Sequence, residues 1–345
     1  MSGIKMSEIQ TQLKSENLSR NLAGTVAALW SWFFLAGLIV FFDVWARIAY
    51  GNSFLFNAYN VQSILVFASA PLLLGLGETL VIIAGGIDLS VGFIMGLASV
   101  VMAQAMRMVG IDVPPGVALV IGTIAAIAIS AVPGGINGFL IARLGVPAFI
   151  GTLGMYGVAR GAGYILADGA TVSVDDEWLQ YIGSGKILGV PIAVILTAVV
   201  VLALHYTLSQ TRFGQYTYAI GANREAATRA GINVKRHTTM LYIISAMCAG
   251  LAGILFTARF SAGAAQAGEP LLLDSIAAVV IGGASLFGGS GNIIGTVIGA
   301  FIIAIIQFGL VFVDVKPFWQ FAVVGIVIII SVLVDQQKRK FGQHP

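Results

Sequence analysis

Residues 61–84 read VQSILVFASAPLLLGLGETLVIIA, a run in which Glu78 is the one charged side chain. A helix needs about 20 apolar residues to cross the hydrocarbon core of a bilayer. The whole chain of 345 residues has this character, with 58% apolar and 10% charged residues. Soluble domains average roughly 45–50% and 25%. The sequence therefore predicts an all-α polytopic membrane protein.

Apolar runs of similar length recur on both sides of this stretch. They form a single transmembrane domain at 22–335, between an N-terminal tail at 1–21 and a C-terminal tail at 336–345. We do not expect the first run to be a cleavable signal peptide, because its polar lead-in is long and no small-residue cleavage site follows it. The predicted spans lie at about 22–42, 61–84, 90–109, 115–140, 147–166, 189–208, 238–258, 271–287, 292–312 and 318–335.

The basic residues favour ten spans with both termini in the cytoplasm. With the N-terminus inside, twelve of the 18 lysines and arginines fall in inner loops or tails. Five fall in outer loops or outer span ends, and Arg160 lies within a span. This bias follows the positive-inside rule. The outer loops are acidic instead, most clearly at Asp175, Asp176 and Glu177.

Several classes of function are excluded by what the sequence lacks. The formal charge of +3 is too small to suggest nucleic-acid binding, and the single cysteine, Cys248, allows no intrachain disulfide or cysteine metal cluster. The nearest approach to a phosphate loop, at 183–187, has Gln180 and Ile187 where that motif needs glycine and Ser/Thr. We therefore expect no enzyme activity, metal or cofactor on this chain, and any ATP-driven work must come from another chain.

The cytoplasmic loop 209–237 encodes a short helix between two turns. Asn223 is a good N-cap, Glu225 suits the first turn of a helix, and Gly231 is a fitting C-terminal stop. Spacing alone leaves open whether this is an ordinary amphipathic loop helix or a docking surface for a partner. The residues that we single out are Gly221, Asn223, Glu225, Ala226, Ala227 and Gly231.

Four stretches resemble the ribose-type monosaccharide permeases of bacterial ABC importers, which are binding-protein-dependent inner-membrane components. The GGIDLS sequence and an EAA-type loop in one chain make this signal strong, and the resemblance covers about 60–330. Glu78 departs from it, because the resemblance leads us to expect an uncharged residue there. The stretches are 214–236, LGETLVIIAGGIDLSVG at 76–92, VPAFIGTLG at 146–154 after Asn137-Gly138, and AAVVIGGASLFGGSGNIIGTVIG at 277–299.

The resemblance implies a ten-helix fold of the cobalamin-importer type in the bacterial inner membrane. This permease and a second copy or paralogue would form the path for a pentose, hexose or inositol-like polyol. A periplasmic binding protein would deliver the sugar. Cytoplasmic ATPase subunits, which hold ATP and Mg²⁺, would dock on the helix of loop 209–237 and drive alternating access.

Two acidic residues within the membrane need a partner or a role. Asp88 follows Gly85-Gly86, where we expect the helix to break. It would either line the pathway or, as we favour, cap the next helix. Glu78 is costly to bury as an ion. It would pair with Arg160, or stay protonated or solvated near a helix end.

The remaining site predictions divide into packing and pathway residues. Glycines at every fourth position let helices approach closely, as at Gly157 and Gly161 and at Gly291, Gly295 and Gly299. A sugar path needs hydrogen-bonding groups and aromatic faces, although the same groups also serve interhelical bonds and interfacial belts. The candidates are Glu78, Asp88, Asn137, Thr152, Tyr156 and Arg160.

A secondary, ion-coupled transporter is the competing class, with Glu78 or Asp88 carrying protons. That class leaves the EAA-type loop without an explanation. A membrane-embedded enzyme is a weaker alternative, because the sequence offers no nucleophile–base or metal constellation.

Overall fold

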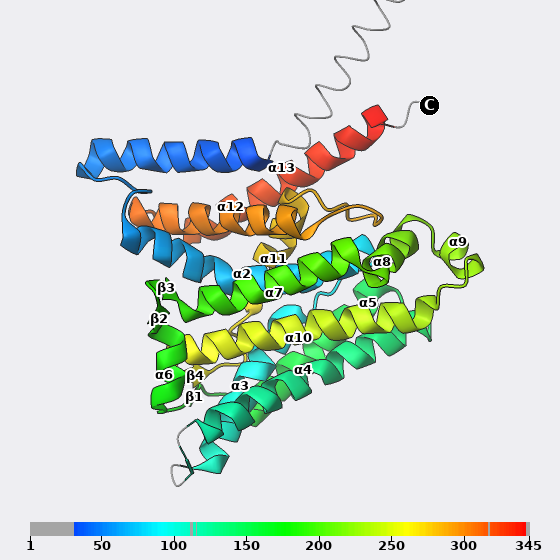
Figure 1. The fold of residues 1–345 in the computed structure, drawn as a ribbon, viewed down its shortest axis with the longest axis horizontal. Coiled ribbons are helices and arrows are strands. Elements are labelled where there is room, and N and C mark those ends of the chain that lie inside the picture. Colours follow the sequence, from blue (N-terminus) through cyan, green and yellow to red (C-terminus); the bar gives the residue numbers. More distant parts are fainter. Residues whose placement is uncertain (1–30, 111–112, 115, 317, 343–345) are drawn as a thin grey trace, which may run out of the picture.

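Helices form nearly all of the regular structure (Figure 1). The structure is a computed structural model that describes residues 31–110, 113–114, 116–316 and 318–342. A helix at Ser31–Tyr50 comes first. The later elements are α2 (Ala58–Ile83), α3 (Val91–Val109), α4 (Val117–Ala142), α5 (Ala148–Leu166), β1 (Val172–Ser173), α6 (Glu177–Ser184), β2 (Lys186–Ile187), β3 (Val190–Pro191), α7 (Ile192–Gln210), α8 (Arg212–Ala222), α9 (Arg224–Arg229), α10 (Val234–Phe260), β4 (Ala262–Gly263), α11 (Glu269–Ile281), α12 (Ile293–Phe312) and α13 (Phe318–Gly342).

Among the described residues, seven helices are long and apolar enough to cross a membrane. They are Ser31–Tyr50, α2, α3, α4, α7, α10 and α12. This confirms an all-α polytopic membrane protein. Helices α5, α11 and α13 coincide in position with the other three predicted spans. The count of ten spans stays a prediction, as does the cytoplasmic placement of both termini.

The first span ends later than the predicted range of 22–42. The tail 1–21 and residues 22–30 lie outside the described residues, and the helix continues past Phe42 to Tyr50. The charge of Asp43 does not end it. The Asp43 carboxylate accepts hydrogen bonds from Arg47 Nε at 2.7 Å and from the backbone N–H of Phe54 at 2.9 Å. A carboxylate with these donors is tolerated within the helix and stabilises the turn that follows it.

The predicted span 271–287 is too long at its C-terminal end. Helix α11 ends at Ile281, and residues 282–292 form a loop. Gly283 has a φ of +90° there, a conformation that disfavours other residues. A Cβ on Gly282 would lie 2.3 Å from the carbonyl oxygen of Gly295. The apolar composition of residues 271–287 therefore gave no sign of the turn that brings α11 and α12 into close contact.

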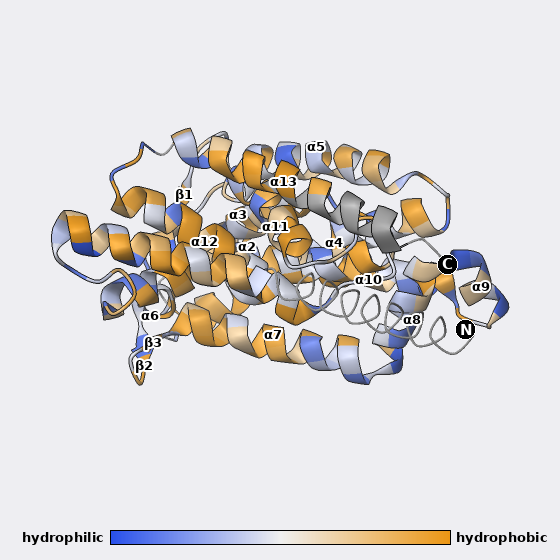
Figure 2. Cartoon of the chain, turned by 90° about the horizontal axis from the view of Figure 1, so that it is seen from above, coloured by the Kyte–Doolittle hydropathy of each residue, from blue (hydrophilic) through white to orange (hydrophobic). Residues whose placement is uncertain are grey.

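Helices α2 and α10 form the centre of the molecule. Helix α10 packs against α2, α3 and α4, and α2 is buried almost without interruption from Leu72 to Ile83. Figure 2 shows apolar residues along the lengths of the helices, and hydrophilic ones gathered on the end that carries α9. Apolar helix faces that no other helix covers suit a lipid environment.

The two ends of the bundle differ. Helices α8 and α9 project from one end, whereas α6 and the strands lie at the other (Figure 1). Strand β1 pairs antiparallel with β4, and β2 pairs antiparallel with β3 in a short hairpin. These four short strands join span ends; they do not form a layer of their own.

Candidate functional site

Helix α9 has the local structure that its sequence predicts. Asn223 Oδ1 accepts a hydrogen bond from the N–H of Ala226 at 2.9 Å and so caps the helix. Gly231, with a φ of +82°, follows its C-terminal end. Glu225 and Arg229 form an exposed ion pair one turn apart, with an N–O distance of 3.5 Å. Such a pair contributes little to stability, so both charges remain available to a partner.

One face of α9 packs against the neighbouring helices α8 and α10. Ala227 is 4% exposed and packs with Ile220 of α8 and Val234 of α10. Ala226, Glu225 and the other residues of α9 are exposed. A helix of six residues is not stable alone, so this packing holds it in a defined position while it presents its outer face to solvent.

Gly221 joins the α8–α9 segment directly to a membrane span. A Cβ on Gly221 would lie 1.8 Å from the carbonyl oxygen of Ile83, the last residue of α2, and 2.6 Å from the backbone nitrogen of Gly289. The N–H of Gly289 donates to that same Ile83 oxygen at 2.8 Å. Three backbone segments therefore meet without intervening side chains, and a displacement of α8 must move the end of α2 or the loop 282–292.

Two side-chain contacts that the sequence prediction missed reinforce this junction. The hydroxyl of Tyr218 on α8 donates to the carbonyl oxygen of Gly291 at 2.7 Å. Burial raises the pKa of this hydroxyl, so it keeps its proton as a donor. Thr217 Oγ1 lies 2.8 Å from His237 Nε2 of α10. The polar residues of GQYTYAIG at 214–221 were the available signal, but their partners lie far along the chain.

A buried polar cluster lies where α2 breaks. Glu78, Asp88, Ser90 and Asn137 are fully buried. Asn137 Nδ2 donates to Ser90 Oγ at 2.9 Å, and the N–H of Asp88 faces Glu78 Oε2 at 3.4 Å. Glu78 Oε1, Asp88 Oδ2 and Asn137 Oδ1 have no hydrogen-bond partner among the described residues. Keeping two carboxylates ionised in such a position would be costly, so we expect this cluster to destabilise the fold.

Two interpretations of these acidic residues are wrong. Asp88 does not cap α3, because Ser90 is the N-cap residue, and Asp88 Oδ1 instead accepts from the N–H of Ser90 at 3.0 Å in a local turn. Glu78 and Arg160 do not pair: among the described residues, the ion pairs are Arg47–Asp43 and Arg229–Glu225. The expected break after α2 is confirmed, since the helix ends at Ile83 and Gly85 has a φ of +79°.

Helix α5 holds the other three pathway candidates one turn apart, along one side of the helix. Thr152 is fully buried and donates to the carbonyl oxygen of Ala148 in its own helix. The ring of Tyr156 packs edge-on against Phe93, with centroids 4.5 Å apart. The guanidinium of exposed Arg160 lies 5.3 Å from the centroid of that same Phe93 ring. An aromatic group and a cation of α5 therefore both pack against Phe93 of α3.

The two glycine series have different surroundings. A Cβ on Gly295 would lie 2.1 Å from the carbonyl oxygen of Gly282, and one on Gly299 would lie 1.9 Å from that of Ala278. These glycines stand where α12 meets α11. Gly291, with a φ of +146°, belongs to the loop before α12. In contrast, no atom of the described residues outside the backbone of α5 itself lies within 4 Å of a Cβ on Gly157 or Gly161.

These features define the class of the protein as a multi-pass membrane subunit whose short extramembrane segment is tied to its spans. The chain belongs to the family described as branched-chain amino acid transport system / permease component, whose model matches residues 60–332. It is 39% identical over 288 residues to the ribose import permease protein of Escherichia coli K12, covering 82% of this chain and 88% of that protein.

Two further relatives have sugar-transport names. The fructose import permease protein of Rhizobium meliloti is 36% identical over 293 residues, covering 83% of this chain and 80% of that protein. The D-allose transport system permease protein of Escherichia coli K12 is 34% identical over 331 residues, covering 94% and 98%. The chain is thus a permease component of a transport system in the bacterial inner membrane.

Proposed function

We propose that this chain is the membrane-spanning permease subunit of a bacterial ABC importer for a monosaccharide. The observation that carries the proposal is α9, which is held against the spans through Gly221 and Ala227 while Glu225 and Ala226 face solvent. A separate ATPase that moves α9 would move the end of α2 with it. The names of the relatives point to a pentose, a hexose or a related polyol as the cargo.

The proposal includes the subunits and the membrane orientation. Ten spans in a cobalamin-importer-like fold place α8, α9 and both termini in the cytoplasm and the acidic segment Asp175–Glu177 outside. A periplasmic sugar-binding protein docks on the outer end. The ATPase, which holds ATP and Mg²⁺, docks on α9, and its contacts include Gly221, Asn223, Glu225 and Gly231.

We place the second permease copy on the outer face of α5. Gly157 and Gly161 leave room there for a close approach, and Leu153 and Val158 on this helix are 47% and 62% exposed. Small residues bordered by apolar ones favour helix packing within a membrane. Tyr156 and Arg160 then stand near the interface between the copies, where a sugar path needs an aromatic face and a hydrogen-bond donor.

The test is uptake into vesicles that contain the purified permease. Uptake of labelled ribose, fructose or allose is expected only when ATP, the ATPase and the matching binding protein are all supplied. It is expected to persist when an uncoupler collapses the proton gradient. Uptake without ATP that the uncoupler abolishes would instead establish an ion-coupled carrier.

A further inference from the structure

A cavity beside α9 has no role in the import cycle described above. Its volume is about 470 Å³, and it lies at the end of the bundle that carries α8 and α9. The end of α2, the turn between α4 and α5, and the first residues of α9 and α10 surround it. Its polar and charged lining residues are Arg143, Arg224, Lys235, Thr238 and Tyr242.

The charge of this cavity is of one sign. Arg143, Arg224 and Lys235 line it, and none of its lining residues is an Asp or Glu. None of these three cations forms an ion pair with another described residue. The carboxylates of Glu78 and Asp88 are fully buried and do not line the cavity. Unpaired cations around a concave surface attract an anion.

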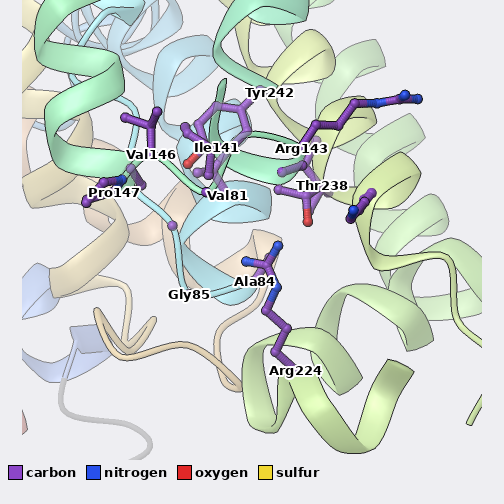
Figure 3. A pocket seen from close by; sticks show the side chains of 16 residues that line it. Val81, Ala84, Gly85, Ile141, Arg143, Val146, Pro147, Arg224, Thr238 and Tyr242 are labelled. Atoms are coloured by element: carbon purple, nitrogen blue, oxygen red, sulfur yellow. The ribbon is translucent and has the colours of Figure 1, made fainter. Parts of the chain in front are cut away.

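A buried hydroxyl gives a second and independent sign of a ligand. Thr238 is 7% exposed, and its Oγ1 has no hydrogen-bond partner among the described residues. Figure 3 shows this oxygen pointing into the cavity toward the guanidinium of Arg224, whereas Arg143 extends outward. A buried hydroxyl without a hydrogen-bond partner is destabilising. An anion between Arg224 and Thr238 would satisfy it.

The apolar surroundings indicate which anion fits. Val81, Ile141 and Pro147 line the same cavity. Leu144, directly before the lining segment 145–148, is 61% exposed. We propose that this cavity binds a phosphate group, supplied by the headgroup of an anionic phospholipid. Basic pockets at the cytoplasmic ends of membrane helices suit such headgroups, and the apolar rim is available to the acyl chains, which a free phosphate ion lacks.

The test measures thermal unfolding of the purified full-length permease in neutral detergent. Cys248 is the only cysteine and is buried, so a thiol-reactive fluorophore reports unfolding directly. Phosphatidylglycerol, phosphatidylcholine and inorganic phosphate are added separately. We expect phosphatidylglycerol to raise the melting temperature by several degrees and phosphatidylcholine to have no effect. Stabilisation by inorganic phosphate as well would support the phosphate site and assign it to a soluble source; no stabilisation by either would overturn the proposal.

Matched double variants separate the cavity from general surface charge. Arg224→Gln with Lys235→Gln removes one cation from α9 and one from α10 inside the cavity. Arg229→Gln with Arg236→Gln removes one from each of the same helices outside it. Only the first pair is expected to raise the half-saturating phosphatidylglycerol concentration, by about tenfold or more. Equal effects of the two pairs would show attraction to the surface alone and would refute the site.

A third variant covers the case in which the charge changes prevent folding. Thr238→Val keeps the shape and the net charge of the cavity while removing the unpaired hydroxyl. Without lipid its melting temperature is expected to equal or exceed that of the wild type. Its stabilisation by phosphatidylglycerol is expected to be smaller. Full stabilisation of this variant would contradict a role for Thr238 in holding the phosphate.

Discussion

Substitution of Gly221 by alanine tests the link between α8 and the spans most directly. The added Cβ would lie 1.8 Å from the Ile83 oxygen, and even tight contacts need 3.0 Å, so the two backbones must separate by more than an ångström. That oxygen also accepts the 2.8 Å hydrogen bond from Gly289. Overpacking costs typically about 1–3 kcal/mol, and a strained or lost hydrogen bond adds about 1 kcal/mol. We therefore expect the native junction to be destabilised by about 2–4 kcal/mol.

Two measurements reveal how the molecule responds to Gly221→Ala. If the junction opens while the spans stay folded, ATP-dependent uptake in vesicles falls by at least about tenfold and the melting temperature changes little. If the whole bundle is strained, the melting temperature reported by Cys248 falls as well. Either result agrees with a junction formed by direct backbone contact.

Gly135→Ala is the matched control for this substitution. Gly135 lies within α4, and a Cβ there meets no other described part of the chain within 4 Å. Alanine favours a helix over glycine by about 1 kcal/mol, so this variant is expected to fold and transport like the wild type. Wild-type uptake and stability in Gly221→Ala would refute the reasoning, since a rigid backbone contact at 1.8 Å cannot accept a methyl group.

Three further variants test the other assignments. Glu225→Arg should abolish recovery of the ATPase with the permease. A charge reversal at the opposite end of the bundle, Lys186→Glu, should leave recovery unchanged. Equal recovery of the ATPase with both variants would argue against docking on α9. Glu78→Gln should raise the melting temperature, because it replaces a fully buried ionisable carboxyl by an amide that can donate to the unpaired oxygens around it, worth about 1–3 kcal/mol; a lower melting temperature would contradict the account of the cluster. Combining Glu78→Gln with Arg160→Gln should give the sum of the single effects, because the side chains do not touch, and a clear non-additivity would restore the pairing hypothesis.

Local signals in the sequence predicted several parts of this structure. Asn223 caps α9, because its side-chain oxygen accepts a hydrogen bond from a free N–H in the first turn of the helix. Gly231 follows the end of α9, because a glycine readily adopts the positive φ found there. Both effects depend on residues within one turn of the helix end. The double glycine at 85–86 ends α2 for a similarly local reason. Apolar length located most of the long helices, but failed at 271–287, where close packing against Gly295 decides the turn.

The polar partners inside the bundle could not be predicted from sequence. Glu78 and Arg160 looked complementary because both are charged and lie within apolar runs. The structure places Arg160 over the ring of Phe93 and Glu78 beside the backbone of Asp88. Which face of one helix meets which face of another depends on packing between distant segments, and opposite charge does not determine it.

The sequence by itself determined the class of the protein, the position of most helices and the bounds of α9. These properties follow from apolar length, charge distribution and hydrogen bonds within a few residues. Only the tertiary structure decided that Gly221 touches Ile83, that Asp88 faces Asn137, and that Arg224 and Thr238 share a cavity. Each of these contacts joins separate elements, and close packing of the whole bundle brings them together.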